Sequence, residues 1–111
     1  IKTNFKNNIL ILNIALNYSS KEEIVNSIKN TVNNKLKINK KNIEKFLYTK
    51  DSSHPDILIR TGGYNRLSDF LLWQCAYTEI FFINKMWPDF LISDYKKILL
   101  EFSNIKRKFG S

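Results

Sequence analysis

Three short apolar runs set the strongest constraint on how this chain can fold. They cover residues 9–16, 57–59 and 80–83, and they are rich in β-branched or aromatic side chains. Each run is short for a helix and lacks the alternation of a half-exposed strand, a profile typical of strands buried on both faces of a parallel sheet. The sequence therefore predicts three buried strands.

Helical patterns separate and follow these runs. Ser20 and Glu23 have the spacing of a capping box, which predicts a helix over about residues 21–36. An apolar side chain recurs there at every fourth position, at Ile24, Ile28, Val32 and Leu36. A weaker helical pattern comes next, at Ile43, Phe46 and Leu47. The loop 51–55 then leads into the second strand, since Pro55 disfavours a helix just before it.

Two further helices are expected in the second half. One begins at Ser68 and is apolar nearly all round over residues 70–77, which is typical of a buried helix. The last begins at Ser93 and Asp94, and the cations of residues 106–108 suit its C-terminal end. Its buried stripe would be Ile98, Leu99, Phe102 and Ile105. This order predicts an α/β fold, with a mostly parallel sheet flanked by helices. Three strands buried on both faces need more sheet beside them, so we expect residues 1–111 to be part of a larger domain.

Charge and composition exclude several classes of protein. The formal net charge is +8, but the excess consists of lysines in residues 1–50, without the arginines and interleaved aromatic residues of a specific nucleic-acid site. We therefore expect no nucleic-acid partner. The single cysteine excludes an internal disulfide and a multi-cysteine metal cluster. No apolar run is long enough for a transmembrane helix, and the start at Ile1 lacks a signal-peptide profile.

One segment holds two of the three arginines. Arg60 and Arg66 flank Gly62 and Gly63, between the end of a predicted strand and the helix start at Ser68. Ligands of open α/β sheets bind outside the carboxyl ends of the strands, where arginine forks and helix-start N–H groups suit phosphate oxygens. Glycines also let backbone N–H groups approach a ligand. The segment predicts a phosphate or diphosphate site, and the alternative is a glycine turn with solvated arginines.

Glu79 is the second candidate, because a carboxylate between two apolar segments needs a partner. It either forms an ion pair or hydrogen bond, or it binds a divalent cation that bridges a diphosphate. The residues alone leave both open. Asp69 is interpreted as a favourable charge in the first turn of its helix, His54 as a surface residue and Cys75 as an apolar core residue.

The sequence around these candidates resembles a known family. The stretches Pro55 to Gly63, Arg66 to Gln74 and Ala76 to Ile80 are similar to the C-terminal signature of the cis-prenyltransferases, which include undecaprenyl and dehydrodolichyl diphosphate synthases. Further similarity lies at residues 12–18, 85–90 and 107–110. The resemblance implies a transferase that adds isopentenyl diphosphate units to an allylic diphosphate such as farnesyl diphosphate. The product would be a cis-polyprenyl diphosphate, as in dolichol synthesis.

The resemblance also implies roles for particular residues. Arg60, Arg66 and Ser68 would hold the diphosphate of isopentenyl diphosphate, Leu67 would contribute its backbone, and Glu79 would bind Mg²⁺. It implies a homodimer in the cytoplasm or at the cytosolic face of the endoplasmic reticulum, with peripheral membrane association through the lipid product. Apolar excess favours the same assembly, with the segment 79–90 and the last helix near the subunit boundary. The alternative is that a missing N-terminal half of the domain covers this patch.

Some features depart from the family pattern. Tyr64 stands where many members have Glu, Asp69 stands in place of Asn, and residues 19–21 read Ser-Ser-Lys in place of Gly-Gly-Arg. Nothing in residues 1–111 resembles the family's catalytic Asp-Gly-Asn-Gly-Arg motif, so the catalytic residue is not among them. We expect the chain to be the C-terminal part of a single domain, inactive by itself. The alternative function is a non-catalytic partner subunit.

Overall fold

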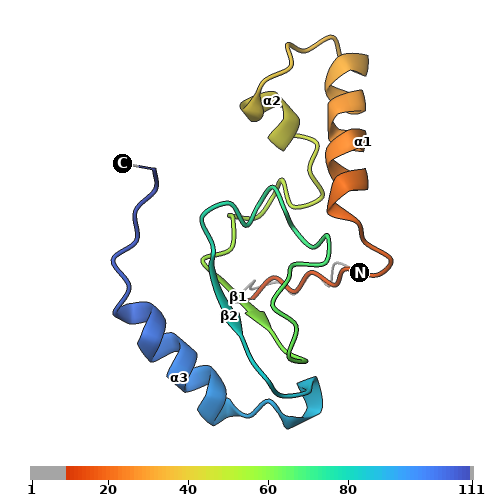
Figure 1. Cartoon of the computed structure of the whole chain (residues 1–111). Helices are drawn as coiled ribbons and strands as arrows, with labels where there is room; N and C mark the ends of the chain where they lie inside the picture. The colour runs from red at the N-terminus through yellow and green to blue at the C-terminus, as the bar shows by residue number, and fades with distance from the viewer. Residues whose placement is uncertain (1–9, 111) are drawn as a thin grey trace.

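The computed structural model describes residues 10–110. Along that range the elements are α1 (Ser20–Asn33), α2 (Lys40–Glu44), β1 (Ile57–Arg60), β2 (Glu79–Phe82), the 3-10 helix η1 (Trp87–Asp89) and α3 (Ile92–Ser103). Strands β1 and β2 pair in parallel, with Ile57 opposite Glu79 and Arg60 opposite Phe82. The helices lie around this strand pair, with α1 and α2 together at one side and α3 at the other (Figure 1). This confirms the predicted α/β class and two of its strands.

The predicted strand over residues 9–16 is wrong for the part that is described. Ile9 lies outside the described residues, and residues 10–16 form no strand. A buried strand needs a neighbouring strand to take its backbone hydrogen bonds. No backbone–backbone bond to another described segment is found for residues 10–16. Their apolar side chains remain on the surface, with Leu10 80% and Leu16 82% exposed.

Helix α1 is confirmed, but its cap and its buried face differ from prediction. Ser19 rather than Ser20 caps it, because the Ser19 hydroxyl accepts a hydrogen bond from the backbone of Glu22. The apolar residues that recur at every fourth position are half-buried or exposed, and Val32 is 53% exposed. The buried face is instead polar, and consists of Ser20, Glu23, Ser27 and Thr31. Small hydroxyl side chains can be buried here because Ser27 and Thr31 each donate to the carbonyl four residues earlier.

The predicted helix over residues 68–77 is wrong. This segment forms turns, and Ser68, Asp69 and Leu71 have φ angles of 49°, 62° and 46° in the left-handed region. Its backbone bonds to α1 instead, since Asp69 O accepts from Ser20 N and Leu72 N donates to the Ser20 hydroxyl. A helix that is apolar all round also needs protein on every side. The described chain buries only Gln74 and Cys75 of this segment.

Helix α3 is confirmed, with a narrower buried stripe than predicted. Ile98 is buried and Phe102 is half-buried, whereas Leu99 and Ile105 are each 39% exposed. The helix ends at Ser103, so the cations of residues 106–108 follow it and do not lie in its last turn. No helix among the described residues is long and apolar enough to cross a lipid bilayer.

Candidate functional site

Arg60 is the last residue of β1, at the carboxyl end of the strand pair, as predicted. Its Nε atom is buried and donates to no acceptor within residues 10–110. Buried donors are nearly always paired, so this N–H is available to an acceptor outside the described residues, as is the Nε of Arg107, which is unpaired in the same way. A phosphate oxygen is such an acceptor, and arginine binds it with charge-assisted hydrogen bonds.

The glycines after Arg60 shape a turn, and their N–H groups are already used. Gly62 and Gly63 have φ angles of 92° and 76°, which side-chain-bearing residues rarely adopt. A Cβ atom on Gly63 would lie 2.7 Å from the side-chain oxygen of Asn84. Gly62 N donates to Lys85 O and Gly63 N to Ile83 O, so the expectation that these amides face a ligand is wrong. The turn fastens the segment after β1 to the end of β2.

Arg66, Leu67 and Ser68 follow this turn. Arg66 is exposed and its guanidinium lies 4.5 Å from the centre of the Tyr64 ring. Ser68 is exposed and Leu67 is half-buried. No helix begins here, so the predicted contribution of a helix N-terminus is absent from this segment. Neither Arg60 nor Arg66 pairs with a carboxylate in the described chain, which leaves both charges available to an anion. We call residues 60–68 the arginine segment.

Glu79 does not lie near Arg60. It is the first residue of β2, opposite Ile57, so it lies at the amino end of the pair. From Ile57 to Arg60 the strand rises by three residue steps, or roughly 10 Å. Its nearest cation is Arg107, whose Nε lies 3.9 Å from Glu79 Oε1. No cluster of three or more His, Cys, Asp or Glu side chains within residues 10–110 could hold a metal ion.

Arg107 fastens the C-terminal tail at that same end. It forms an ion pair with Asp56 at 2.5 Å and donates to the carbonyl oxygen of Tyr77 at 3.0 Å. Sequence analysis placed Arg107 at a helix end and did not predict these contacts. His54, predicted to be a surface residue, is exposed, and Cys75 is buried as predicted.

A buried carboxylate, which the sequence analysis considered only as part of a cap, joins three segments. Glu23 is fully buried and accepts hydrogen bonds from the Tyr18 hydroxyl, from Tyr48 N at 2.7 Å, and from Gln74 Nε2 at 3.2 Å. Burial, together with the bond to Glu23, raises the pKa of Tyr18 to about 12. Glu23 thus links α1, the chain after α2 and the turns of residues 68–77.

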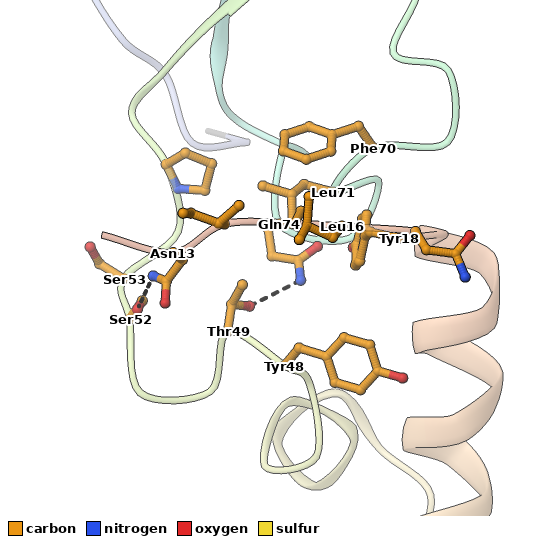
Figure 2. Close-up of a pocket in the computed structure, with 14 residues that line it drawn as sticks. Asn13, Leu16, Tyr18, Tyr48, Thr49, Ser52, Ser53, Phe70, Leu71 and Gln74 are labelled. Carbon is orange, nitrogen blue, oxygen red and sulfur yellow. Dashed lines mark hydrogen bonds between the residues drawn. The ribbon is translucent and has the colours of Figure 1, made fainter. Parts of the chain in front are cut away.

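A cavity of about 410 Å³ adjoins this carboxylate. Figure 2 shows Gln74 and Thr49 on its wall, joined by a hydrogen bond of 3.0 Å, with Phe70 from the same turns as Gln74 and Tyr18 from the chain before α1. Among the described residues its lining includes no lysine or arginine and none of the predicted diphosphate residues. The described lining therefore offers no cation to a diphosphate, whereas the arginine segment offers two.

Comparison with known proteins identifies the family. The family model described as "Putative undecaprenyl diphosphate synthase" matches residues 1–110. The chain belongs to the undecaprenyl diphosphate synthase family. This confirms the resemblance on which the residue roles were based.

Relatives within the synthase family are about twice as long as this chain. It is 44% identical to a ditrans,polycis-undecaprenyl-diphosphate synthase of Buchnera aphidicola subsp. Baizongia pistaciae, specific for (2E,6E)-farnesyl diphosphate, over 98% of this chain and 46% of that protein. It is also 44% identical to a geranylgeranyl-diphosphate-specific tritrans,polycis enzyme of Pyrococcus furiosus, over 95% of this chain and 42% of that protein. A crystal structure of a probable undecaprenyl diphosphate synthase from Campylobacter jejuni matches with a TM-score of 0.78 and 36% identity, over 85% of this chain and 44% of the other.

Proposed function

We propose that the protein to which this chain belongs is a transferase that adds isopentenyl diphosphate to an allylic diphosphate and makes a cis-polyprenyl diphosphate. One structural observation carries the proposal beyond family membership. Two arginines that pair with no carboxylate among residues 10–110 lie on one short segment at the carboxyl end of the strands, and one of them has a buried N–H without an acceptor in that range. This is where ligands of α/β sheets bind, and it is chemically suited to a diphosphate.

The arginine segment would bind the isopentenyl diphosphate that attacks. Arg60 and Arg66 would donate to phosphate oxygens, the Ser68 hydroxyl would donate a further hydrogen bond, and Leu67 would contribute its backbone. The allylic diphosphate ionises, the isopentenyl double bond attacks the resulting carbocation, and a proton is lost. Fixed cations around the bound diphosphate hold the double bond in line for attack without reorganising during the reaction.

Mg²⁺ is the metal that the family resemblance implies, with Glu79 as its ligand. Mg²⁺ usually takes one or two carboxylates together with phosphate and water oxygens, so a single Glu is chemically acceptable. The position of Glu79 does not suit this role. Glu79 lies at the opposite end of the strand pair from Arg60 and beside the cation of Arg107. Within one chain these residues do not fit one Mg²⁺–diphosphate site. We therefore restrict the proposal for Glu79 to a diphosphate other than the one bound by Arg60 of the same chain.

We also propose a homodimer that buries the segment 79–90 and α3. Trp87 is 72% exposed, Ile92 75% and Leu100 66%, and such apolar surfaces usually mark interfaces. Homodimer interfaces are large and apolar, so association should survive high salt. Light scattering of the full-length protein at micromolar concentration checks this, and a monomer would contradict it.

The proposed location is the cytoplasm or the cytosolic face of the endoplasmic reticulum, with the lipid product as the membrane contact.

Transfer of radiolabelled isopentenyl diphosphate to farnesyl or geranylgeranyl diphosphate by the full-length protein tests the proposed function. We expect a polyprenyl diphosphate with cis double bonds in the added units when Mg²⁺ is supplied. All-trans product would contradict the proposal. Absence of transfer would favour the alternative, a non-catalytic subunit. The motivation for this alternative is Tyr64, which stands at a position that is often Glu in the family. The alternative predicts that activity returns when a catalytic partner chain is added.

A further inference from the structure

Asp69 joins the end of the arginine segment to the first turn of α1. Its Oδ2 accepts a hydrogen bond from the Ser19 hydroxyl at 2.6 Å, and its Oδ1 accepts one from Lys21 N at 3.1 Å. The Asp69 carbonyl oxygen accepts a third bond from Ser20 N at 2.9 Å. A single residue therefore makes three hydrogen bonds to a helix start that lies about fifty positions earlier in the sequence. We call this set of contacts the Asp69 clamp.

The clamp acts where the backbone is strained. Ser68 and Asp69 both have left-handed φ angles, at 49° and 62°, which cost free energy for residues other than glycine. Such conformations persist only when surrounding contacts hold them. Ser68 is exposed, and its side chain makes no hydrogen bond within residues 10–110, so it does not hold its own conformation. A backbone bond from Phe70 N to Leu67 O closes the turn around it, and the bonds of Asp69, the next residue, tie this turn to α1.

We propose that Asp69 is a positioning residue for diphosphate binding, which it supports by holding Ser68 and Arg66 in place against α1. This inference rests on the proposed function, since it assumes that these two residues bind a diphosphate. Asp69 itself contacts no part of that site. Its negative charge is also well placed at the positive end of α1, which strengthens the clamp. Releasing the clamp should weaken isopentenyl diphosphate binding more than it slows the chemical step.

Steady-state kinetics of the full-length protein test this with matched variants. Asp69→Asn keeps the shape but removes the charge, and Ser19→Ala removes one bond of the clamp. We expect Asp69→Asn to raise the KM for isopentenyl diphosphate about threefold to tenfold, with kcat changed by less than about twofold. The control is Asn39→Ala, which removes the side-chain cap of α2, a bond of 2.9 Å to Asn42 N that does not involve the arginine segment. It should leave the KM unchanged.

The double variant Ser19→Ala/Asp69→Asn separates a shared bond from two independent effects. Because both changes act on the same 2.6 Å bond, which Asp69→Asn deprives of its charge and Ser19→Ala removes, the double variant should raise the KM less than the product of the two single effects. Strictly multiplicative effects would overturn the clamp. So would an unchanged KM in Asp69→Asn, provided that circular dichroism shows native helix content.

Limited proteolysis gives a readout that does not depend on activity. Trypsin cleaves after Arg66, which is exposed, so its rate there reports how firmly the segment is held. Trypsin should cleave the Asp69→Ala variant after Arg66 several-fold faster than the wild type, and it should cleave Asn39→Ala at the wild-type rate. An unchanged cleavage rate would overturn the inference even if transfer is observed. A wild-type protein without transferase activity would instead count against the proposed function, and the cleavage rates would still decide whether the clamp exists.

Discussion

Arg60→Ala in the full-length protein should raise the KM for isopentenyl diphosphate by about tenfold to a hundredfold. Within the described part of the chain the guanidinium has a buried Nε without an acceptor and no carboxylate beside it, so its contacts to phosphate oxygens would be its principal interactions. Charge-assisted hydrogen bonds contribute roughly 1.5–3 kcal/mol each. Arg66→Ala should have a smaller effect, since Arg66 is exposed to water and partly engaged with Tyr64.

A charge-matched control distinguishes specific contacts from general attraction. Lys29→Ala removes one exposed positive charge from α1, far along the chain from the arginine segment. It should change the KM little, because water and salt screen the charge of an exposed lysine. The diphosphate assignment is wrong if both arginine variants keep the wild-type KM, or if Lys29→Ala raises it as much as Arg60→Ala does.

Glu23→Ala should destabilise the fold by roughly 2–5 kcal/mol. Glu23 is fully buried, and its removal leaves Tyr48 N, the Tyr18 hydroxyl and one of the two Gln74 amide N–H groups without this acceptor, while the other Gln74 N–H still bonds to Thr49. Unpaired buried donors cost far more than the net contribution of a hydrogen bond that is formed. Urea unfolding measures the effect. Glu22→Ala, at the neighbouring exposed position, should lower the free energy of unfolding by less than about 1 kcal/mol.

The same network predicts how stability depends on alkaline pH. The pKa of Tyr18 is raised to about 12 from its ordinary 10.0, chiefly by burial and then by the hydrogen bond to Glu23. The unfolded chain therefore loses this proton first, and the stability that neutral Tyr18 contributes is lost as pH rises from about 10 to about 12. In Glu23→Gln, ultraviolet titration should show a lower Tyr18 pKa. An unchanged pKa, or an unfolding free energy that Glu23→Ala leaves intact, would contradict the network.

The elements that sequence predicts well are those defined by local patterns. Strands β1 and β2 and helices α1 and α3 appear where apolar runs or helical spacing place them. The strand at residues 9–16 and the helix at 68–77 depend on neighbours that the described chain does not provide, so local patterns could not determine them. In the sequence, Ser19 is part of a departure from the family pattern, and Asp69 is a departure that suits the first turn of a helix that does not form. Their contact joins positions fifty residues apart, which no periodicity reveals.

The candidate site was predictable in its residues more than in its geometry. Arginine in a lysine-rich chain and the glycine pair single out the arginine segment, and the end of β1 at Arg60 agrees with its predicted place. The distance between Arg60 and Glu79 was available from the sequence, since Arg60 ends one predicted strand and Glu79 precedes another. In parallel strands these positions lie at opposite ends. The partners of Arg107 and the buried state of Glu23 follow from tertiary packing alone.

The most direct test of the central claim is a crystal structure of the full-length protein with isopentenyl diphosphate bound. The account predicts phosphate oxygens within hydrogen-bonding distance of the Arg60 and Arg66 guanidinium groups and of the Ser68 hydroxyl. It predicts no phosphate in the cavity beside Tyr18 and Gln74, which lacks cations. A diphosphate bound in that cavity, or anywhere that leaves both arginines in contact only with water, would contradict it.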